Sequence, residues 1–141
     1  MSKLTSLVYV SSAVKNLSND DLEHLLSRAR GRNLEHNISG LLLFIGGNFM
    51  QCIEGEAHDV DYIFEIIMED AMHAGLIKLL HEPIENRDFS NWAMAYCTKN
   101  KVVMAGDSND QEILSGKLGA LSYKETPARI LLAHFWHRNS P

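Results

Sequence analysis

The sequence has 141 residues, a length that suits one compact domain with a real core but is short for two. Apolar residues make up 45% of it, which excludes a disordered chain, and the formal net charge of −5 argues against a surface that neutralises nucleic-acid phosphates. No apolar run is long enough to span a bilayer, and the N-terminal residues enter a strand pattern without a signal-peptide region. We therefore expect a cytoplasmic protein that binds neither nucleic acid nor membranes, with Cys52 and Cys97 as free, buried thiols.

The first half of the chain predicts strands around one helix. Residues 4–11 predict a strand, and Ser18 and Asp21 form an N-cap pattern for a helix that should end near Gly31. Residues 38–45 are apolar on both faces, as in a central strand. A glycine pair at 46–47 then allows a hairpin into a strand over residues 49–54.

The second half predicts another helix, two more strands and a helical tail. Apolar residues recur at helical spacing from Val60 to Ala71, and Gly75 should close this helix. Residues 76–83 and 91–98 predict strands. The pattern breaks at residues 105–110, before a weak helix over 111–121. Thr126 and Pro127 then provide an N-cap and a first helical residue for a last helix with an apolar stripe: Ala128, Leu131, Leu132, Phe135 and Trp136.

This order, β-α-β-β-α-β-β, predicts an α+β protein with a ferredoxin-like sheet and both helices on one of its faces. Apolar and small side chains then remain on the opposite face: Val8, Val10, Met50, Cys52, Ala93 and Ala95. Something must cover them, and we expect the tail to form a helical cap. The chain accordingly divides into a domain over residues 1–98 and a C-terminal segment over 99–141.

Polar side chains interrupt the apolar face of two core strands. Because side chains alternate along a strand, Tyr9 shares a face with Leu7, and Gln51 lies between Phe49 and Ile53. A buried phenol and amide are costly unless they form hydrogen bonds. Together with an asparagine and a tryptophan, they could satisfy this need by holding a planar ligand.

Each of these residues also has an ordinary structural explanation. Tyr9 alone could be a core tyrosine with a satisfied hydroxyl, and Asn33 could be a local cap after the helix. Trp92 and Met94 could simply fill the core. Their occurrence together, in order, favours the ligand site.

In that order and spacing the sequence resembles the BLUF family, blue-light sensors that use FAD. The likeness covers roughly the first two-thirds of the chain. It rests on these residues and motifs: Tyr9, Asn33, Ile38-Ser39-Gly40-Leu41-Leu42, Gln51-Cys52-Ile53-Glu54-Gly55 and Trp92-Ala93-Met94.

The resemblance implies an FAD whose ring lies between the two helices. Asn33 would bind the ring's carbonyl and imide edge, and Gln51 would bridge Tyr9 to flavin N5 and O4. Blue light would drive transfer of an electron and a proton from Tyr9, leaving Gln51 rotated or tautomerised with a new hydrogen bond to O4. Trp92 and Met94 would carry the change into the fifth strand.

The remaining cofactor contacts follow from a shorter match. Asp70 and His73 match an Asp-x-Arg-His run that the family often has near the ribityl chain and phosphates, with Met72 in place of the arginine. Arg32 is a plausible neighbour of the ring or phosphates; the alternative is a solvated arginine at a helix end.

We thus expect a stand-alone photoreceptor that is not an enzyme and signals to an unknown partner protein or through its own homo-oligomer. The alternative is a light-insensitive flavin-binding or protein-interaction module of the same fold. His134 and His137 lack further ligands for a metal site, so no metal is expected. The open sheet face lacks the aromatics of an RNA-binding sheet. An acylphosphatase-like enzyme would need an arginine in the loop after the first strand, and Ser11 to Val14 has none.

Overall fold

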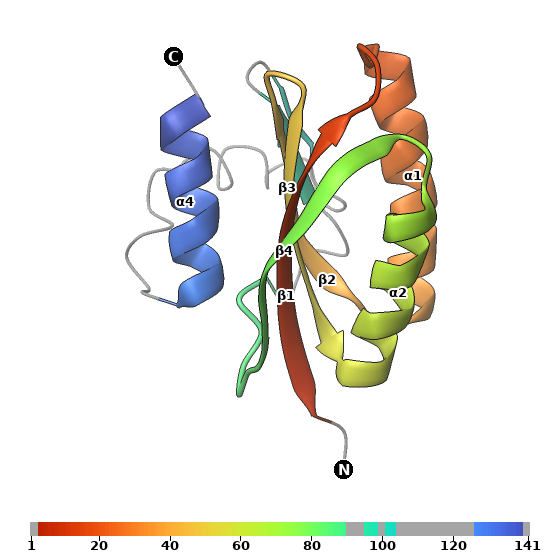
Figure 1. Ribbon diagram of the computed structural model, residues 1–141. Helices are drawn as coiled ribbons and strands as arrows, with labels where there is room; N and C mark the ends of the chain where they lie inside the picture. The colour runs from red at the N-terminus through yellow and green to blue at the C-terminus, as the bar shows by residue number, and fades with distance from the viewer. Residues whose placement is uncertain (1–2, 90–94, 99–100, 104–125, 140–141) are drawn as a thin grey trace.

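A computed structural model of the chain describes residues 3–89, 95–98, 101–103 and 126–139. A sheet forms the central layer, two helices cover one face of it, and a third helix lies on the opposite face (Figure 1). The strands are β1 (Leu4–Ala13), β2 (Ser39–Ile45), β3 (Asn48–Glu56), β4 (His73–Pro83), β5 (Ala95–Thr98) and β6 (Lys101–Val103). The helices are α1 (Asn19–Glu35), α2 (Ala57–Glu69) and α4 (Pro127–Asn139).

The strand order is β4-β1-β3-β2-β5-β6. The pairs β1–β3, β1–β4 and β2–β3 are antiparallel, whereas β2 and β5 are parallel. This arrangement confirms the expected ferredoxin-like sheet, with β5 added beside β2. The short strand β6, which the sequence did not predict, pairs antiparallel with β5.

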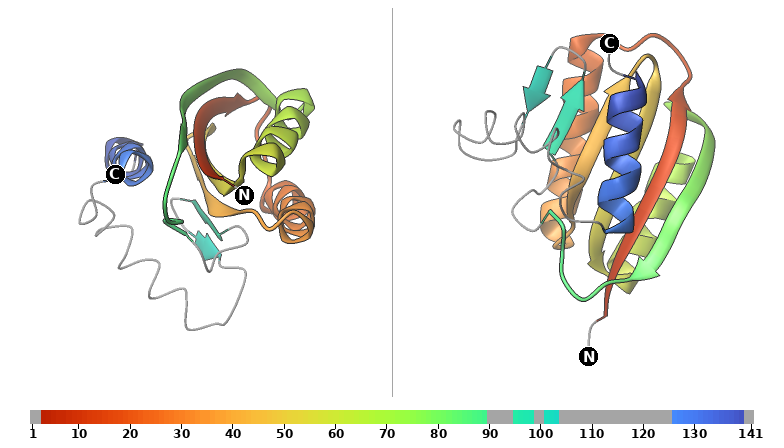
Figure 2. Two further views of the ribbon diagram at one scale, coloured as in Figure 1. Left: turned by 90° about the horizontal axis from the view of Figure 1, so that it is seen from below. Right: turned by 90° about the vertical axis from the view of Figure 1, so that its left-hand side faces the viewer.

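The sheet separates two hydrophobic cores, one on each of its faces. The core under α1 and α2 contains Leu7, Tyr9, Phe49 and Ile53 from the strands. The other core contains Val8, Met50 and Cys52, and α4 adds its apolar side chains: Ala128, Leu132, Ala133 and Phe135. The predicted alternation along β1 and β3 is therefore confirmed. So is the expectation that the last helix covers the second face, as the two views in Figure 2 show.

The end of α1 differs from the sequence prediction. Ser18 caps the helix as expected, since its Oγ accepts from the Asp21 amide at 3.1 Å. The prediction that the helix ends near Gly31 is wrong, because α1 continues to Glu35. Asn37 adopts a left-handed φ of 53°, and the amide of Ile38 then donates to the carbonyl of Asn33 at 2.8 Å. This hydrogen bond closes the helix as in a Schellman motif, so Asn33 lies inside the last turn and not after it.

The second helix also ends differently from its prediction. It runs from Ala57 to Glu69, and Gly75 does not close it. Asp70 has an extended ψ of 121° and its carboxylate accepts from the amide of Met72 at 2.9 Å, which turns the chain. Gly75, with a φ of 61°, lies inside β4 near a register shift in its pairing with β1.

Three glycines of the sheet have a clear structural reason. Gly46 and Gly47 have φ values of 60° and 82°, as the tight hairpin between β2 and β3 requires. A Cβ on Gly40 would lie 1.9 Å from the carbonyl oxygen of Cys52 on β3. The motif over residues 38–42 therefore has glycine where the backbones of β2 and β3 approach closely.

The remaining sequence predictions have mixed outcomes. The strand at 91–98 is confirmed over Ala95–Thr98. The weak helix at 111–121 lies outside the described residues. The division of the chain at residue 98 stays a prediction. Among the residues that the structure describes, no helix is long and apolar enough to cross a membrane.

Candidate functional site

A narrow cleft runs between α1 and α2, above the strands that carry Tyr9 and Gln51. The open space in it measures only about 20 Å³. Aliphatic side chains form part of its walls, and polar groups form the rest. The lining residues are Tyr9, Leu25, Ala29, Arg32, Asn33, Leu42, Gln51, Ile63, Ile67, Asp70 and His73.

Tyr9 and Gln51 are directly opposite each other in the β1–β3 pair. The Tyr9 hydroxyl donates a hydrogen bond to Oε1 of Gln51, and the two side chains are 1% and 5% exposed. Burial raises the pKa of the Tyr9 phenol far above its usual value; the charge of Asp70 acts in the same direction, and Arg32 acts against it. The phenol is therefore held neutral, with its proton directed to the glutamine.

The last turn of α1 brings Arg32 and Asn33 into the cleft. Asn33 is 1% exposed, so its amide lies within the protein where it can donate and accept at once. Nε of Arg32 is buried and has no hydrogen-bond partner among the described residues. A buried donor of this kind is costly without a partner, so an acceptor on a ligand edge would stabilise it.

Asp70 and His73 line the cleft beyond the end of α2. Nδ1 of His73 lies 2.8 Å from Oγ of Ser11, and its ring meets the Tyr9 ring edge-on at 6.0 Å. Burial lowers the pKa of His73, and the charge of Asp70 partly opposes this. His73 is therefore predominantly neutral near pH 7. Met72 packs against the apolar core of this face.

Two predicted site residues, Trp92 and Met94, lie outside the described residues. The other predicted residues line one cleft, as the sequence required of a ligand site. Leu25 and Ala29 of α1 contribute apolar wall, and Ile63 and Ile67 belong to the helical recurrence predicted from Val60 to Ala71. Ser11 was not predicted, because its role depends on the register between β1 and β4, which places β1 beside His73.

The lining suits a planar, mostly apolar ligand with donors and acceptors along one edge. Aliphatic side chains from both helices can cover the two faces of a ring system, while Asn33, Arg32 and Gln51 can bind its polar edge. At the start of α2, Glu56, His58 and Asp59 have ligand atoms within 4.8 Å of one another, but they do not line this cleft.

The family model described as sensors of blue-light using FAD matches residues 4–95, a range that contains the whole described cleft. The chain belongs to the BLUF family. It carries a flavin-binding, blue-light-sensing module, as the resemblance in motifs predicted.

Individual relatives agree with this assignment. The chain is 29% identical over 126 residues to the photoactivated adenylate cyclase subunit beta of Euglena longa, covering 89% of this chain and 14% of that protein. It is 32% identical over 91 residues to the blue light- and temperature-regulated antirepressor BluF of Escherichia coli, covering 64% of this chain and 23% of that protein. The chain thus spans under a quarter of the length of either relative.

A solved structure matches over almost the full length of both chains. The dark-state structure of BlrB, a BLUF protein, superposes with a TM-score of 0.70 and 28% identity, covering 96% of this chain and 95% of that one. The match therefore extends beyond the family region into the C-terminal part of the chain.

Proposed function

We propose that the flavin of this module is FAD and that it binds in the cleft between α1 and α2. The observation that carries the proposal is the pairing of Tyr9 with Gln51 at the floor of a cleft. The wall of this cleft holds Nε of Arg32, a buried donor that has no partner among the described residues. Asn33, Arg32 and Gln51 would hold the ring edge. Asp70 and His73 would lie nearer the ribityl chain, and Trp92 and Met94 would complete the site.

When bound, FAD would supply the absorption of blue light and an acceptor for one electron. Tyr9 is the donor that we assign, because an oxidised phenol becomes strongly acidic and an acceptor for its proton already stands at Gln51 Oε1. In darkness the raised pKa of Tyr9 keeps this proton on the phenol. After the electron and proton have returned to Tyr9, the Gln51 amide is left rotated or tautomerised. Exchange of its donor and acceptor ends is the lasting change, and no covalent bond forms.

The first test is spectroscopic. Purified protein reconstituted with FAD should be yellow, and its absorption should shift reversibly to longer wavelength under blue light and recover in darkness. Reconstitution with FMN in parallel tests whether the site requires the adenine dinucleotide. Bound flavin with a spectrum that light does not change would instead favour the light-insensitive module.

A variant at Asn33 tests the placement of the ring edge. Each net hydrogen bond contributes on the order of 1 kcal/mol, so Asn33→Ala should weaken FAD binding roughly tenfold or more with the fold intact. Fluorescence titration of the apoprotein with FAD measures the effect. Asn48→Ala, at an exposed position on the hairpin, is the control and should bind FAD like the parent chain. Equal affinity in Asn33→Ala would place the ring elsewhere.

We propose that the output is a light-dependent interaction with a partner protein or with further copies of the chain, without an enzymatic activity of its own. A change confined to one amide is worth about 1–2 kcal/mol, which can repopulate a marginal contact but cannot unfold a core. Among the residues that the structure describes, α4 is the helix that packs on the open face of the sheet, and we assign this packing as the contact that changes. We therefore infer that light shifts α4.

A further inference from the structure

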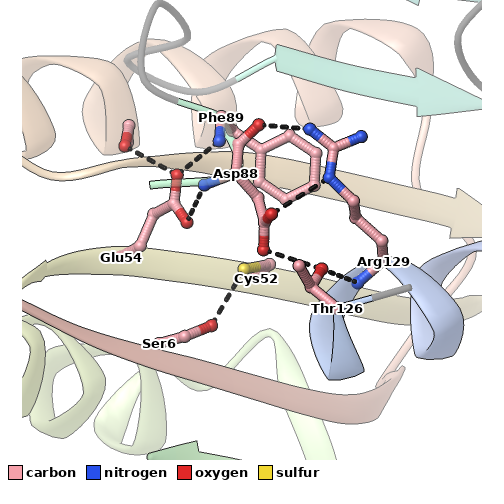
Figure 3. Close-up of polar contacts among 8 residues, drawn as sticks. Ser6, Cys52, Glu54, Asp88, Phe89, Thr126 and Arg129 are labelled. Carbon is pink, nitrogen blue, oxygen red and sulfur yellow. Dashed lines mark hydrogen bonds and ion pairs between the residues drawn. The ribbon is translucent and has the colours of Figure 1, made fainter. Parts of the chain in front are cut away.

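A buried carboxylate lies three residues after Gln51 on the same strand. Glu54 is 0% exposed and points to the α4 side of the sheet, whereas Gln51 points to the α1 and α2 side. Its oxygens accept from the amide of Asp88 at 2.9 Å, the amide of Phe89 at 2.6 Å and Oγ of Ser39 at 3.1 Å (Figure 3). Glu54 therefore binds the backbone of residues 88–89 to β3.

The same segment holds the start of α4. Nε of Arg129 lies 3.0 Å from Oδ1 of Asp88, and its Nη2 donates to the Asp88 carbonyl at 2.8 Å. Oγ1 of Thr126 donates to Oδ2 of Asp88 at 3.0 Å and also accepts from the amide of Arg129 at 3.3 Å. The Arg129 and Asp88 side chains are only 16% and 10% exposed, so water screens this ion pair weakly. These hydrogen bonds therefore fix the orientation of the Asp88 side chain and of the first turn of α4.

The rest of the buried face of α4 has a different character. Its buried side chains are apolar: Ala128, Leu132, Ala133 and Phe135. Apolar contacts have little directional preference, so a helix can slide a fraction of an ångström over them at small cost. Charge-assisted hydrogen bonds weaken steeply with distance and angle. A small displacement of β3 or of residues 88–89 should therefore weaken the hydrogen bonds between Asp88 and Arg129 before it weakens the apolar contacts of α4.

We propose that Glu54, Asp88, Thr126 and Arg129 form the joint that fixes α4 in its dark position and passes the change at Gln51 to this helix. Residue 54 is bonded to residues 88–89, and residue 88 is bonded to residues 126 and 129, so polar contacts lead from β3 to α4 without a gap (Figure 3). Glu54 and Asp88 act as positioning residues and have no part in the photochemistry. The inference rests on the proposed photochemical function, and it names the contacts through which the change at Gln51 would reach α4.

The test uses the full chain loaded with FAD. Asp88→Asn and Arg129→Gln each remove one charge of the ion pair. Asparagine keeps the size of the aspartate, and glutamine keeps a shorter polar side chain at position 129. Arg138→Gln removes the same charge from an exposed position on the same helix and is the matched control. Hydrogen exchange of residues 127–139 is measured in darkness and under continuous blue light, with the absorption shift recorded on the same samples.

In the parent chain and in Arg138→Gln, exchange of α4 should be slow in darkness and faster in light. In Asp88→Asn and Arg129→Gln the red shift should keep its size, while exchange in the first turns of α4 should already be raised in darkness by about tenfold. The difference between light and dark should then largely vanish. Arg129→Lys, which keeps the charge but cannot make both contacts with Asp88, should give an intermediate result and serves if the other variants fold poorly.

Two results would overturn the proposal that these residues link β3 to α4. One is a full-sized light–dark difference in Asp88→Asn; the other is an α4 that exchanges identically in light and darkness in a parent chain whose spectrum shifts. Absence of a red shift in the parent chain would contradict the proposed photochemical function instead. In that case dark exchange still decides whether Asp88 and Arg129 fix α4.

Discussion

Tyr9→Phe should abolish the light-induced red shift while flavin remains bound. The substitution removes the hydroxyl that donates to Gln51 and keeps the ring, which is 1% exposed and packs against Phe64 at 5.9 Å. Phenylalanine is a far poorer one-electron donor and has no proton to release, so neither step assigned to Tyr9 can occur. Difference absorption spectra under blue light, on samples of equal flavin content, measure the loss.

Gln51→Leu should give the same result through the other partner. Leucine matches glutamine in approximate size but cannot accept from Tyr9 or exchange a donor end for an acceptor end. Tyr62→Phe is the control for Tyr9→Phe, because Tyr62 is 49% exposed on α2 and should leave the shift unchanged. A normal red shift in Tyr9→Phe would refute the assignment of the electron donor.

The strand positions of the site could be predicted from the sequence because alternation is a local property. The placement of Tyr9 with Leu7, and of Gln51 between Phe49 and Ile53, needed only a period of two along each strand. That the two residues face each other depends on the β1–β3 register, which the short hairpin at 46–47 does not set. The family motifs supplied the pairing that periodicity could not.

The ends of the helices were harder to predict, because glycine is not the only residue that terminates a helix. Gly31 suggested the end of α1, but the helix continues four residues further, to Glu35. Asn37 then adopts the left-handed conformation that ends it. This moved Asn33 from a cap position into the last turn of α1. In the same way Asp70 turns the chain after α2 and leaves Gly75 inside β4.

The contacts of Glu54 could not be predicted, since they join segments that are distant in the sequence. Glu54 stands out in its motif as an acidic residue in a buried strand, but its partners lie 34 and 35 positions further along the chain. Asp88 and Arg129 are 41 positions apart, and neither occurs in a local pattern that indicates an ion pair. Only the packing of α4 over β3 brings the three together.

Glu54→Gln should destabilise the fold even though it removes a buried charge. The carboxylate accepts from two backbone amides and a serine hydroxyl, whereas the amide of glutamine presents donors at one end. At least one buried amide of residues 88–89 would then face another donor. An unsatisfied buried donor costs about 1–3 kcal/mol, or a decrease of up to roughly 10 °C in Tm. Thermal unfolding followed by circular dichroism measures this, with the exposed Glu85→Gln as the matched control.

The pH dependence of this deficit tests the electrostatic part. Burial raises the pKa of Glu54 in the folded protein, and the hydrogen bonds from residues 88–89 only partly oppose it. The folded chain therefore binds the proton more readily than the unfolded chain. The resulting stabilisation is fully present below the ordinary carboxyl pKa and is lost as pH rises through the raised value. The free energy of unfolding of Glu54→Gln should thus fall further below that of the parent chain at about pH 5 than at about pH 8. A deficit that grows with pH would mean that the hydrogen bonds favour the ionised carboxylate more strongly than burial opposes it.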